Sequence, residues 1–147
     1  MISLDTNILV YATDQKSAGA RHALARRIVD AAKNVKIGLA EQVLVEFINV
    51  AVRKTRLPLN QVAPYVDAFS RDFPLLLPSR DTVAQVLALL FRHNLSVWDA
   101  HILAVCSSNG CNHLLSEDLQ DGAQYGGVTV VNPFAARNAR LLQRLLA

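Results

Sequence analysis

Short apolar runs, separated by longer segments of helical periodicity, constrain the fold of this chain most strongly. The runs are apolar at successive positions, as in strands of a parallel sheet covered by helices on both faces. The predicted strands are roughly Ile2 to Asp5, Val35 to Leu39, Leu75 to Leu77, His113 to Ser116 and Val128 to Val131. The pair Gly126-Gly127 predicts a turn before the last strand.

Helices are expected between these strands. Their approximate bounds are Ala18 to Lys33, Ala40 to Lys54, Asn60 to Asp72, Arg80 to His93, Val97 to Asn109 and Phe134 to Leu146. Strands that alternate with helices imply right-handed crossovers. The predicted fold class is therefore α/β, a three-layer α/β/α sandwich around a short, mostly parallel sheet of about five strands. Ligands of such folds usually bind outside the carboxyl ends of the strands.

The segment from Arg80 to His93 has the clearest helical pattern. Its apolar residues recur at i, i+3, i+4, i+7 and i+8, which predicts one face turned toward the core. These residues are Val83, Val86, Leu87, Leu90 and Phe91. Ser79 is the expected N-cap and Asn94 the expected stop.

Length and composition predict one compact domain over residues 1–147. A chain of 147 residues with 52% apolar content fills one core and is short for two. No apolar run approaches the roughly 18 residues of a membrane span, so a cytoplasmic protein without membrane association is expected. Cys106 and Cys111 suit reduced core thiols better than a disulfide framework.

Four acids stand in or beside strongly apolar segments: Asp5, Glu46, Asp99 and Asp118. Burying an ionised carboxylate costs several kcal/mol unless a cation or hydrogen bonds compensate. A shared cation would satisfy all four together. The pattern indicates an oxygen-ligand site for Mg²⁺ or Mn²⁺, and phosphodiester hydrolysis as its chemistry.

The predicted sandwich explains how distant acids could meet. Asp5 ends the first strand and Asp118 follows the fourth, so neighbouring parallel strands would carry both to one edge of the sheet. Glu46 lies on an inward sector of its helix, beside Val43 and Phe47. Asp99 lies in the first turn of its helix, where the helix dipole favours a carboxylate.

Each acid also has a purely structural interpretation, and that of Glu46 is the weakest. Asp99 follows Ser96 at capping-box spacing. Asp5-Thr6-Asn7 could form an Asx-turn, and Asp118 could close a loop. Glu46 has no local cation until Arg53, seven residues on. The functional hypothesis therefore depends on the four acids together.

The charge balance favours a polyanionic partner. Fifteen Lys and Arg face twelve Asp and Glu, and setting the four candidate ligands aside leaves eight acids. A basic surface around an acidic pocket is typical of proteins that bind and cut nucleic acid, although basic helix faces can also serve solvation alone. The two clusters are Lys16, Arg21, Arg26, Arg27 and Lys33, then Arg53, Lys54 and Arg56.

Four motifs taken together resemble the PIN-domain ribonucleases, and most of all the VapC-type toxins of bacterial toxin–antitoxin pairs. They are Leu4-Asp5-Thr6-Asn7-Ile8-Leu9-Val10-Tyr11-Ala12, Val43 to Phe47, Trp98-Asp99-Ala100-His101-Ile102-Leu103-Ala104 and Leu114-Leu115-Ser116-Glu117-Asp118-Leu119-Gln120-Asp121-Gly122. The resemblance covers nearly the whole chain in order.

The resemblance implies an Mg²⁺-dependent endoribonuclease, with Mn²⁺ as a possible substitute, that inhibits translation as a toxin. Its catalytic acids would be Asp5, Glu46, Asp99 and Asp118, of which Asp5, Asp99 and Asp118 would bind the metal. Supporting polar residues would be Thr6, Asn7, Ser116 and Asp121. The implied partners are RNA, a cognate antitoxin and a second copy of the chain. Leu141, Leu142, Leu145 and Leu146 could form a dimer face or pack on the protein's own sheet.

Other classes remain as alternatives. A non-catalytic PIN-like module would bind RNA or a partner through the same acids. An aspartyl-phosphate phosphatase would need a second acid where Asn7 stands and a late lysine, and none follows Lys54. A zinc site of His101, Cys106, Cys111 and His113 lacks the usual paired spacing. Trp98 could stack on a base or pack in the core.

Overall fold

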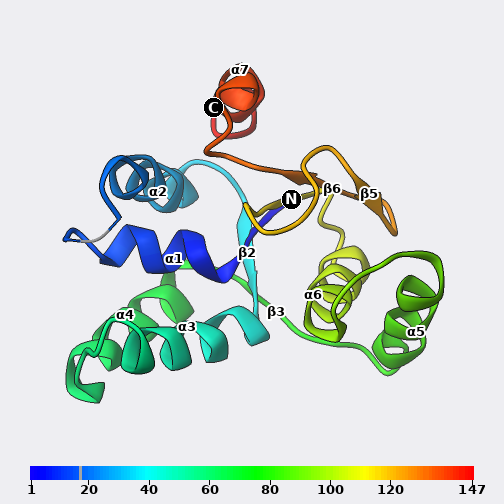
Figure 1. Cartoon of the computed structure of the whole chain (residues 1–147), viewed down its shortest axis with the longest axis horizontal. Coiled ribbons are helices and arrows are strands. Elements are labelled where there is room, and N and C mark those ends of the chain that lie inside the picture. The colour runs from blue at the N-terminus through cyan, green and yellow to red at the C-terminus, as the bar shows by residue number, and fades with distance from the viewer. Residues whose placement is uncertain (17) are drawn as a thin grey trace.

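The computed structural model describes residues 1–16 and 18–147. Its strands form one six-stranded sheet over these residues, in the order β3-β2-β1-β4-β6-β5 (Figure 1). All neighbouring strands are parallel except β5, which is antiparallel to β6. The strands are β1 (Ile2–Leu4), β2 (Ile37–Ala40), β3 (Leu75–Leu76), β4 (His113–Leu115), β5 (Gln124–Tyr125) and β6 (Val128–Val131).

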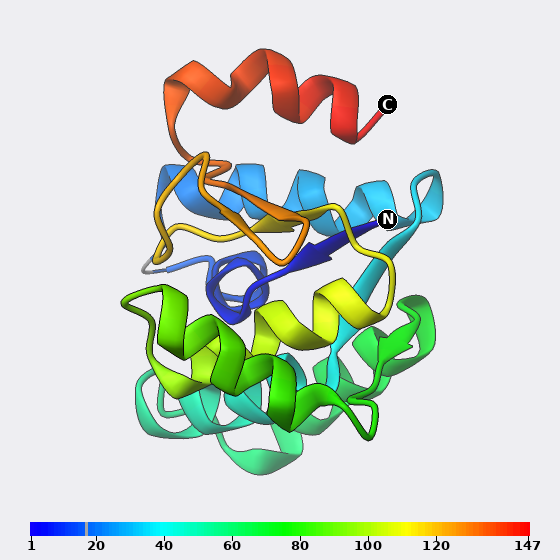
Figure 2. The same cartoon turned by 90° about the vertical axis from the view of Figure 1, so that its right-hand side faces the viewer.

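The helices cover both faces of this sheet, which confirms the predicted three layers. Helices α1 to α4 lie on one side and α5 and α6 on the other, while α7 packs next to α2 (Figures 1 and 2). Their bounds are α1 (Thr6–Thr13), α2 (Ala20–Asp30), α3 (Glu41–Arg53), α4 (Leu59–Asp72), α5 (Thr82–Arg92), α6 (Val97–Ser108) and α7 (Ala139–Leu145), with short 3₁₀ turns at Ala31–Lys33 and Ala136–Asn138.

The observed sheet agrees with the predicted sheet of about five strands and adds one short strand, β5. The five predicted strands are all present, but β5 was missed because it has only two residues and only one of them, Tyr125, is buried. The predicted turn at Gly126 and Gly127 is confirmed, and it joins β5 to β6 as a hairpin. Both glycines have positive φ, 55° and 84°, as a two-residue hairpin turn requires.

The first helix was also missed. The chain enters α1 directly after β1, with Asp5 as N-cap, whereas the structural alternative considered for Asp5-Thr6-Asn7 was an Asx-turn. Ile8, Leu9 and Ala12 are buried, so this helix is part of the core. The run Ile8-Leu9-Val10 is apolar at successive positions and showed no helical period. A helix buried on several sides loses the polar stripe by which helices are recognised.

Helix α5 is present as predicted, but its apolar residues do not all face inward. Val86 is 8% exposed and packs near Ala100 and Ala104 of α6. By contrast, Val83, Leu87 and Phe91 are 71%, 52% and 89% exposed. The helix packs mainly on α6. Because a single neighbouring helix covers only a narrow part of its surface, the rest of the apolar face of α5 stays exposed.

The C-terminal helix packs on its own domain. Leu142 is buried, and Leu141, Leu145 and Leu146 are partly buried against the main core. Both cysteines are buried free thiols, in agreement with the sequence-based prediction. Over the described residues, no helix is long and apolar enough to cross a membrane.

The order of the strands creates one special position in the sheet. From β1 the chain moves outward to β2 and β3 through α1 to α4, and then returns through α5 and α6 to β4, on the other side of β1. The crevice between β1 and β4 is therefore the topological switch point, where α/β folds bind their ligands at the carboxyl ends of the strands. Asp5 follows β1 at this point, and Ser116 follows β4.

Candidate active site

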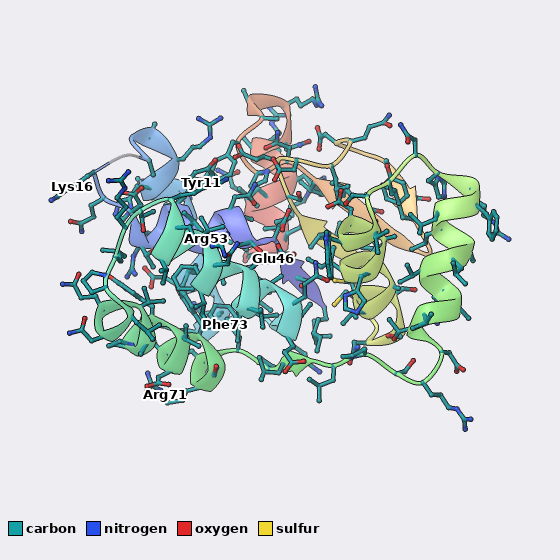
Figure 3. All side chains as sticks on the ribbon, turned by 60° about the horizontal axis from the view of Figure 1, so that its bottom comes forward. Tyr11, Lys16, Glu46, Arg53, Arg71 and Phe73 are labelled. Carbon is teal, nitrogen blue, oxygen red and sulfur yellow. The ribbon has the colours of Figure 1, made fainter. Side chains whose placement is uncertain are left out.

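A cleft of about 560 Å³ opens at the carboxyl ends of β1 and β4. All four candidate acids line it: Asp5, Glu46, Asp99 and Asp118. They come from the end of β1, the middle of α3, the first turn of α6 and the loop after β4. Figure 3 shows Glu46 on α3 at the middle of the molecule, whereas Lys16 and Arg71 lie at its outer edge. The fold therefore brings the four acids to one place.

The premise that these acids are buried needs correction. Asp5, Glu46 and Asp99 are only partly buried, and Asp118 is exposed. The acids line an open cleft instead of the core, because strand ends and helix starts lie at the edge of the sandwich. The unfavourable energy of the metal-free site therefore includes repulsion between neighbouring carboxylates as well as desolvation.

Asp5 is held by two hydrogen bonds. Its Oδ1 accepts from the Thr6 N–H at 2.7 Å and its Oδ2 from the Ser116 hydroxyl at 2.6 Å. The buried Ser116 Oγ also accepts from the Asp118 N–H at 3.2 Å. Ser116 thus connects the acid after β1 with the acid after β4.

Glu46 is oriented through both of its oxygens. Oε2 accepts from the Thr6 hydroxyl at 3.0 Å, and Oε1 accepts from Gln42 Nε2 at 2.6 Å. The carbonyl oxygen of Gln42 is hydrogen-bonded to His101 Nδ1. Gln42 and His101 were not among the predicted site residues. The i, i+4 spacing of Gln42 and Glu46 on α3 was the available signal for the first of them.

Asn7 holds Asp118 and has a further free oxygen. Its Nδ2 donates to Asp118 Oδ2 at 2.9 Å. Its Oδ1 is buried and has no hydrogen-bond partner among the described residues. A buried acceptor without a partner costs free energy unless a cation or a water satisfies it.

Asp99 lies in the first turn of α6, whose cap is Ser96. The Ser96 hydroxyl oxygen accepts from the Asp99 N–H at 3.0 Å, so the predicted capping role of Ser96 is confirmed. The Asp99 side chain lines the cleft at the same time. The hydrogen bond to Ser96 uses only the backbone N–H of Asp99, so its carboxylate is left to the cleft.

Burial and like charges raise the pKa of two acids. Burial raises the pKa of Asp5; the hydrogen bonds from Ser116 and Thr6 oppose this, and Asp118 and Glu46 raise it further. Although Asp118 is exposed overall, partial shielding of its carboxylate from solvent raises its pKa, as do Glu117 and Asp99, against the hydrogen bond from Asn7 and the charge of Lys54. Both shifts mean that the metal-free cleft disfavours its full negative charge.

Asp121 lies outside the lining of the cleft. Its Oδ1 accepts from the Asn132 N–H and from Asn138 Nδ2, both at 2.8 Å, and its Oδ2 accepts from Arg137 Nε at 2.7 Å. Burial raises the pKa of Asp121, but these hydrogen bonds outweigh it and lower the pKa overall. This acid ties the loop after β4 to the C-terminal segment and does not contact the other acids.

A fifth acid, Glu117, lines the cleft beside Tyr11. It accepts hydrogen bonds from the Tyr11 hydroxyl and, at 3.1 Å, from Arg21 Nε. Burial and Glu117 raise the pKa of Tyr11 to about 12. Arg21 lies 5.8 Å from the centre of the Tyr11 ring and 5.5 Å from that of Phe134. Glu117 thus forms an ion pair with Arg21, which is not among the residues that line the cleft.

The donor set of the cleft fits a hard divalent cation. The described residues contain no group of three or more His, Cys, Asp or Glu that already encloses an ion site. Mg²⁺ does not require a closed cage, because it keeps several waters and usually takes one or two protein carboxylates together with substrate phosphates. The raised pKa values of Asp5 and Asp118 and the unpaired Asn7 oxygen are features that a bound cation relieves.

Basic residues lie on one side of the cleft. Lys54 lines the cleft and also an adjacent pocket of about 710 Å³, which is lined by Lys16, Arg26 and His22 as well. Lys54 of the second predicted cluster therefore lies next to the acids, and Lys16 and Arg26 of the first line the adjacent pocket. This arrangement provides cations for a phosphate backbone that enters the cleft.

Comparison with known proteins gives a family match and several structural neighbours. The family model described as the PIN domain matches residues 2–120. A toxin–antitoxin complex from Klebsiella pneumoniae is 24% identical, with a TM-score of 0.68, covering 91% of this chain and 98% of that one. No curated protein matches.

Two further solved structures are similar over most of their length. The sarcin-ricin loop cleaving toxin VapC20 from Mycobacterium tuberculosis is 22% identical, with a TM-score of 0.64, over 80% of this chain and 92% of that one. VapBC2 from Rickettsia felis, bound to a DNA fragment from its promoter, is 20% identical, with a TM-score of 0.64, over 88% and 97%. At these identities the likeness shows a shared fold.

Proposed function

Because the chain belongs to the PIN-domain family, we propose that it is a metal-dependent ribonuclease that hydrolyses phosphodiester bonds at the acid cleft. One observation carries the proposal. Four acids that lie far apart in the sequence line a single cleft at the topological switch point, next to a pocket that contains basic residues. A structural role for each acid would not require them to share one site.

The acids of the cleft would have two different roles, metal binding and activation of the attacking water. Asp5, Asp99 and Asp118 would hold Mg²⁺, with Mn²⁺ as a possible substitute. When bound, such an ion polarises the scissile phosphate and lowers the pKa of a bound water toward neutrality. Glu46, fixed by Thr6 and Gln42, orients the attacking water and accepts its proton.

The surrounding polar residues keep the acids in place. Ser116 fixes Asp5 relative to the loop after β4, and Asn7 fixes Asp118. Lys54 offsets the charge of a phosphate brought against the acids. Preorganisation of this kind matters because a displaced carboxylate loses catalytic rate steeply.

The direct test is cleavage of labelled RNA with Mg²⁺ and, in parallel, with EDTA. We expect cleavage only with the metal, and a loss of roughly 10³-fold or more in Asp5→Asn, since metal catalysis supplies several kcal/mol. The matched control is Asp67→Asn, which removes an exposed acid of α4 outside the cleft and should leave the rate unchanged.

Metal binding is checked separately by thermal unfolding. Mg²⁺ should raise the unfolding temperature of the native protein and of Asp67→Asn, but not of Asp5→Asn, because a ligand stabilises only the state that binds it. Cleavage that survives EDTA or Asp5→Asn would contradict the mechanism. RNA binding without cleavage in Mg²⁺ would instead identify a non-catalytic module.

The biological role we propose is that of a toxin in a toxin–antitoxin pair that inhibits translation. Its support is the similarity to a toxin–antitoxin complex, to VapC20 and to VapBC2. The partners would be a cognate antitoxin and a second copy of the chain, and the buried free thiols suit a reducing cytoplasm. Sequencing the ends of cellular RNAs after induction of the protein would identify the RNA and the cleavage site.

A further inference from the structure

A second pocket, of about 810 Å³, shares a wall with the acid cleft. Gln42, Glu46 and Trp98 line both. The rest of its lining is largely apolar and includes Val45, Leu76 and Pro78. A group in this pocket would therefore lie next to a phosphate held at the acids.

Trp98 is 67% exposed at the boundary of the two pockets. It is the only tryptophan of the chain. The sequence left its role open between core packing and base stacking, and its exposure rules out core packing. Exposed aromatic rings beside nucleic-acid channels act as stacking platforms, because every base has a flat π-face.

The charges on the two sides of the cleft are opposite. The pocket beside Trp98 is lined by Glu41 and Glu46 and by no Lys or Arg among the described residues. The pocket on the other side is lined by three cations, Lys16, Arg26 and Lys54, against one acid, Asp14. Phosphates are favoured on the basic side and repelled on the acidic side. A neutral, flat group suits the pocket beside Trp98.

A polar relay connects this pocket to Glu46. Gln42 Nε2 donates to Glu46 Oε1 and, at 3.2 Å, to the Trp98 carbonyl oxygen. Its own carbonyl oxygen therefore accepts from His101 Nδ1–H. His101 also lines the pocket, and this contact through Nδ1 leaves its Nε2 for a ligand. The exposed Asn49 amide adds a donor and an acceptor, as recognition of a base edge requires.

We propose that this pocket binds one unpaired base of single-stranded RNA, stacked on Trp98, next to the scissile phosphate. The inference rests on the proposed function, because it concerns the RNA base that would lie next to the phosphate cut in the acid cleft. Trp98 and the polar groups around it would then determine which nucleotide lies beside the cleavage site. Bases within a duplex could not enter, since their faces are already stacked.

Binding is tested without cleavage, through the fluorescence of Trp98. The native protein is titrated in EDTA with a short single-stranded RNA and with an abasic oligonucleotide of the same length and charge. We expect the RNA to quench the fluorescence and the abasic oligonucleotide to leave it nearly unchanged. Equal quenching by both, or none by RNA, would overturn the proposal.

Substitution of Trp98 gives the second arm. Trp98→Ala should weaken RNA binding by about 5- to 150-fold, the effect of losing one stacked base, and should raise KM more than it lowers kcat. Trp98→Phe should restore most of the affinity, since it keeps an aromatic face. Phe91→Ala is the matched control, because it removes an exposed aromatic ring of α5 that lines neither pocket. Its affinity and KM should equal those of the native protein.

The outcomes separate this inference from the proposed function. If native protein cuts RNA and Trp98→Ala cuts it with unchanged KM, the ribonuclease stands and the base pocket fails. If RNA quenches Trp98 and Trp98→Ala weakens binding, but no RNA is cut in Mg²⁺, the pocket stands and the ribonuclease fails. A Trp98 signal that responds to a basic apolar peptide and not to RNA would assign the pocket to a protein partner and overturn the proposal.

Discussion

At the scale of single residues, Asp5 and Asp121 have opposite electrostatic surroundings. Asp5 follows β1, and Asp121 lies in the loop after the neighbouring strand β4. Asp5 lies among other acids, and its pKa is raised first by burial and then by Asp118 and Glu46. Asp121 lies among donors from Asn132, Arg137 and Asn138, and its pKa is lowered despite burial. The first setting suits a group that awaits a cation, and the second suits a structural anchor.

Replacing these aspartates by asparagine should therefore affect stability in opposite ways. In EDTA at pH 7, Asp5→Asn should leave the free energy of unfolding unchanged or raise it, because it removes a repelled charge. Asp121→Asn should lower it by about 1.5 to 3 kcal/mol, the value of hydrogen bonds to a charged group. Urea unfolding of both variants measures this. A marked loss of stability in Asp5→Asn would indicate that Asp5 serves mainly to cap α1.

The pH dependence follows from the same shifts. The raised pKa of Asp5 makes the folded state bind its proton more tightly, so its contribution to stability is largest below pH 3.8 and is lost as pH rises through the folded value. The lowered pKa of Asp121 contributes stability above pH 3.8, which is lost as pH falls through the folded value. The deficit of Asp121→Asn should accordingly shrink in acid.

The residues that the sequence could not identify are those that act across elements. The four acids stood out because each interrupts an apolar segment. Gln42 and His101 did not, since a polar residue on a helix is ordinary until its partners are known. Their contact joins α3 to α6 across 59 positions of sequence. Asp121 was included as a supporting residue of the site because of its motif, but the motif does not show the direction of its side chain, which contacts Asn132, Arg137 and Asn138.

At the scale of elements, α5 shows how far helical periodicity predicts packing. The pattern predicted the helix and its ends to within two residues. It did not predict which apolar residues are covered, because that depends on the neighbouring surface. Among the described residues, α5 packs mainly on α6. The small residues Ala100 and Ala104 of α6 admit Val86, while Val83 stays exposed.

Two valines of α5 provide a matched test of this packing. Val86→Ala should lower the free energy of unfolding by about 1 to 3 kcal/mol, through lost apolar burial and a residual cavity. Val83→Ala makes the same chemical change at an exposed position and should stay within about 0.5 kcal/mol. Chemical unfolding measures both. Equal losses would mean that the Val83 side of α5 is covered in solution, for example by a second copy of the chain.

At the scale of the whole molecule, strand order is what the sequence left undetermined. Alternating strands and helices predicted the layers and the parallel pairing. They did not show that strands are added first on one side of β1 and then, from β4 on, on its other side. Crossover rules fix the handedness of each connection but leave the order of the strands open. Nor did the alternation of elements show that Arg26 of α2 and Lys54, the residue after α3, line one pocket beside the acids.

The basic side of the cleft should govern the salt dependence of RNA binding. Each phosphate contact adds about −0.7 to the slope of log K against log salt for single strands. Arg26→Gln should weaken binding and reduce the steepness by roughly this amount, since Arg26 lines the basic pocket. Arg71→Gln, also exposed and also paired with a nearby aspartate, should change neither. Fluorescence anisotropy at 50 to 200 mM salt measures the slopes, and equal effects would place the phosphates elsewhere.

The position of the cleft between β1 and β4 also sets when it can exist during synthesis. The hydrogen bond from Asn7 to Asp118 spans 111 positions of sequence. At about 5 to 20 residues per second, a ribosome needs roughly 6 to 22 s between these two residues. Until β4 and the loop after it have been made and have docked beside β1, the growing chain lacks Asp118 in the cleft, and Asp5 lacks its hydrogen bond from Ser116. A protein that cuts RNA would thus stay inert beside the ribosome that makes it for most of its own synthesis.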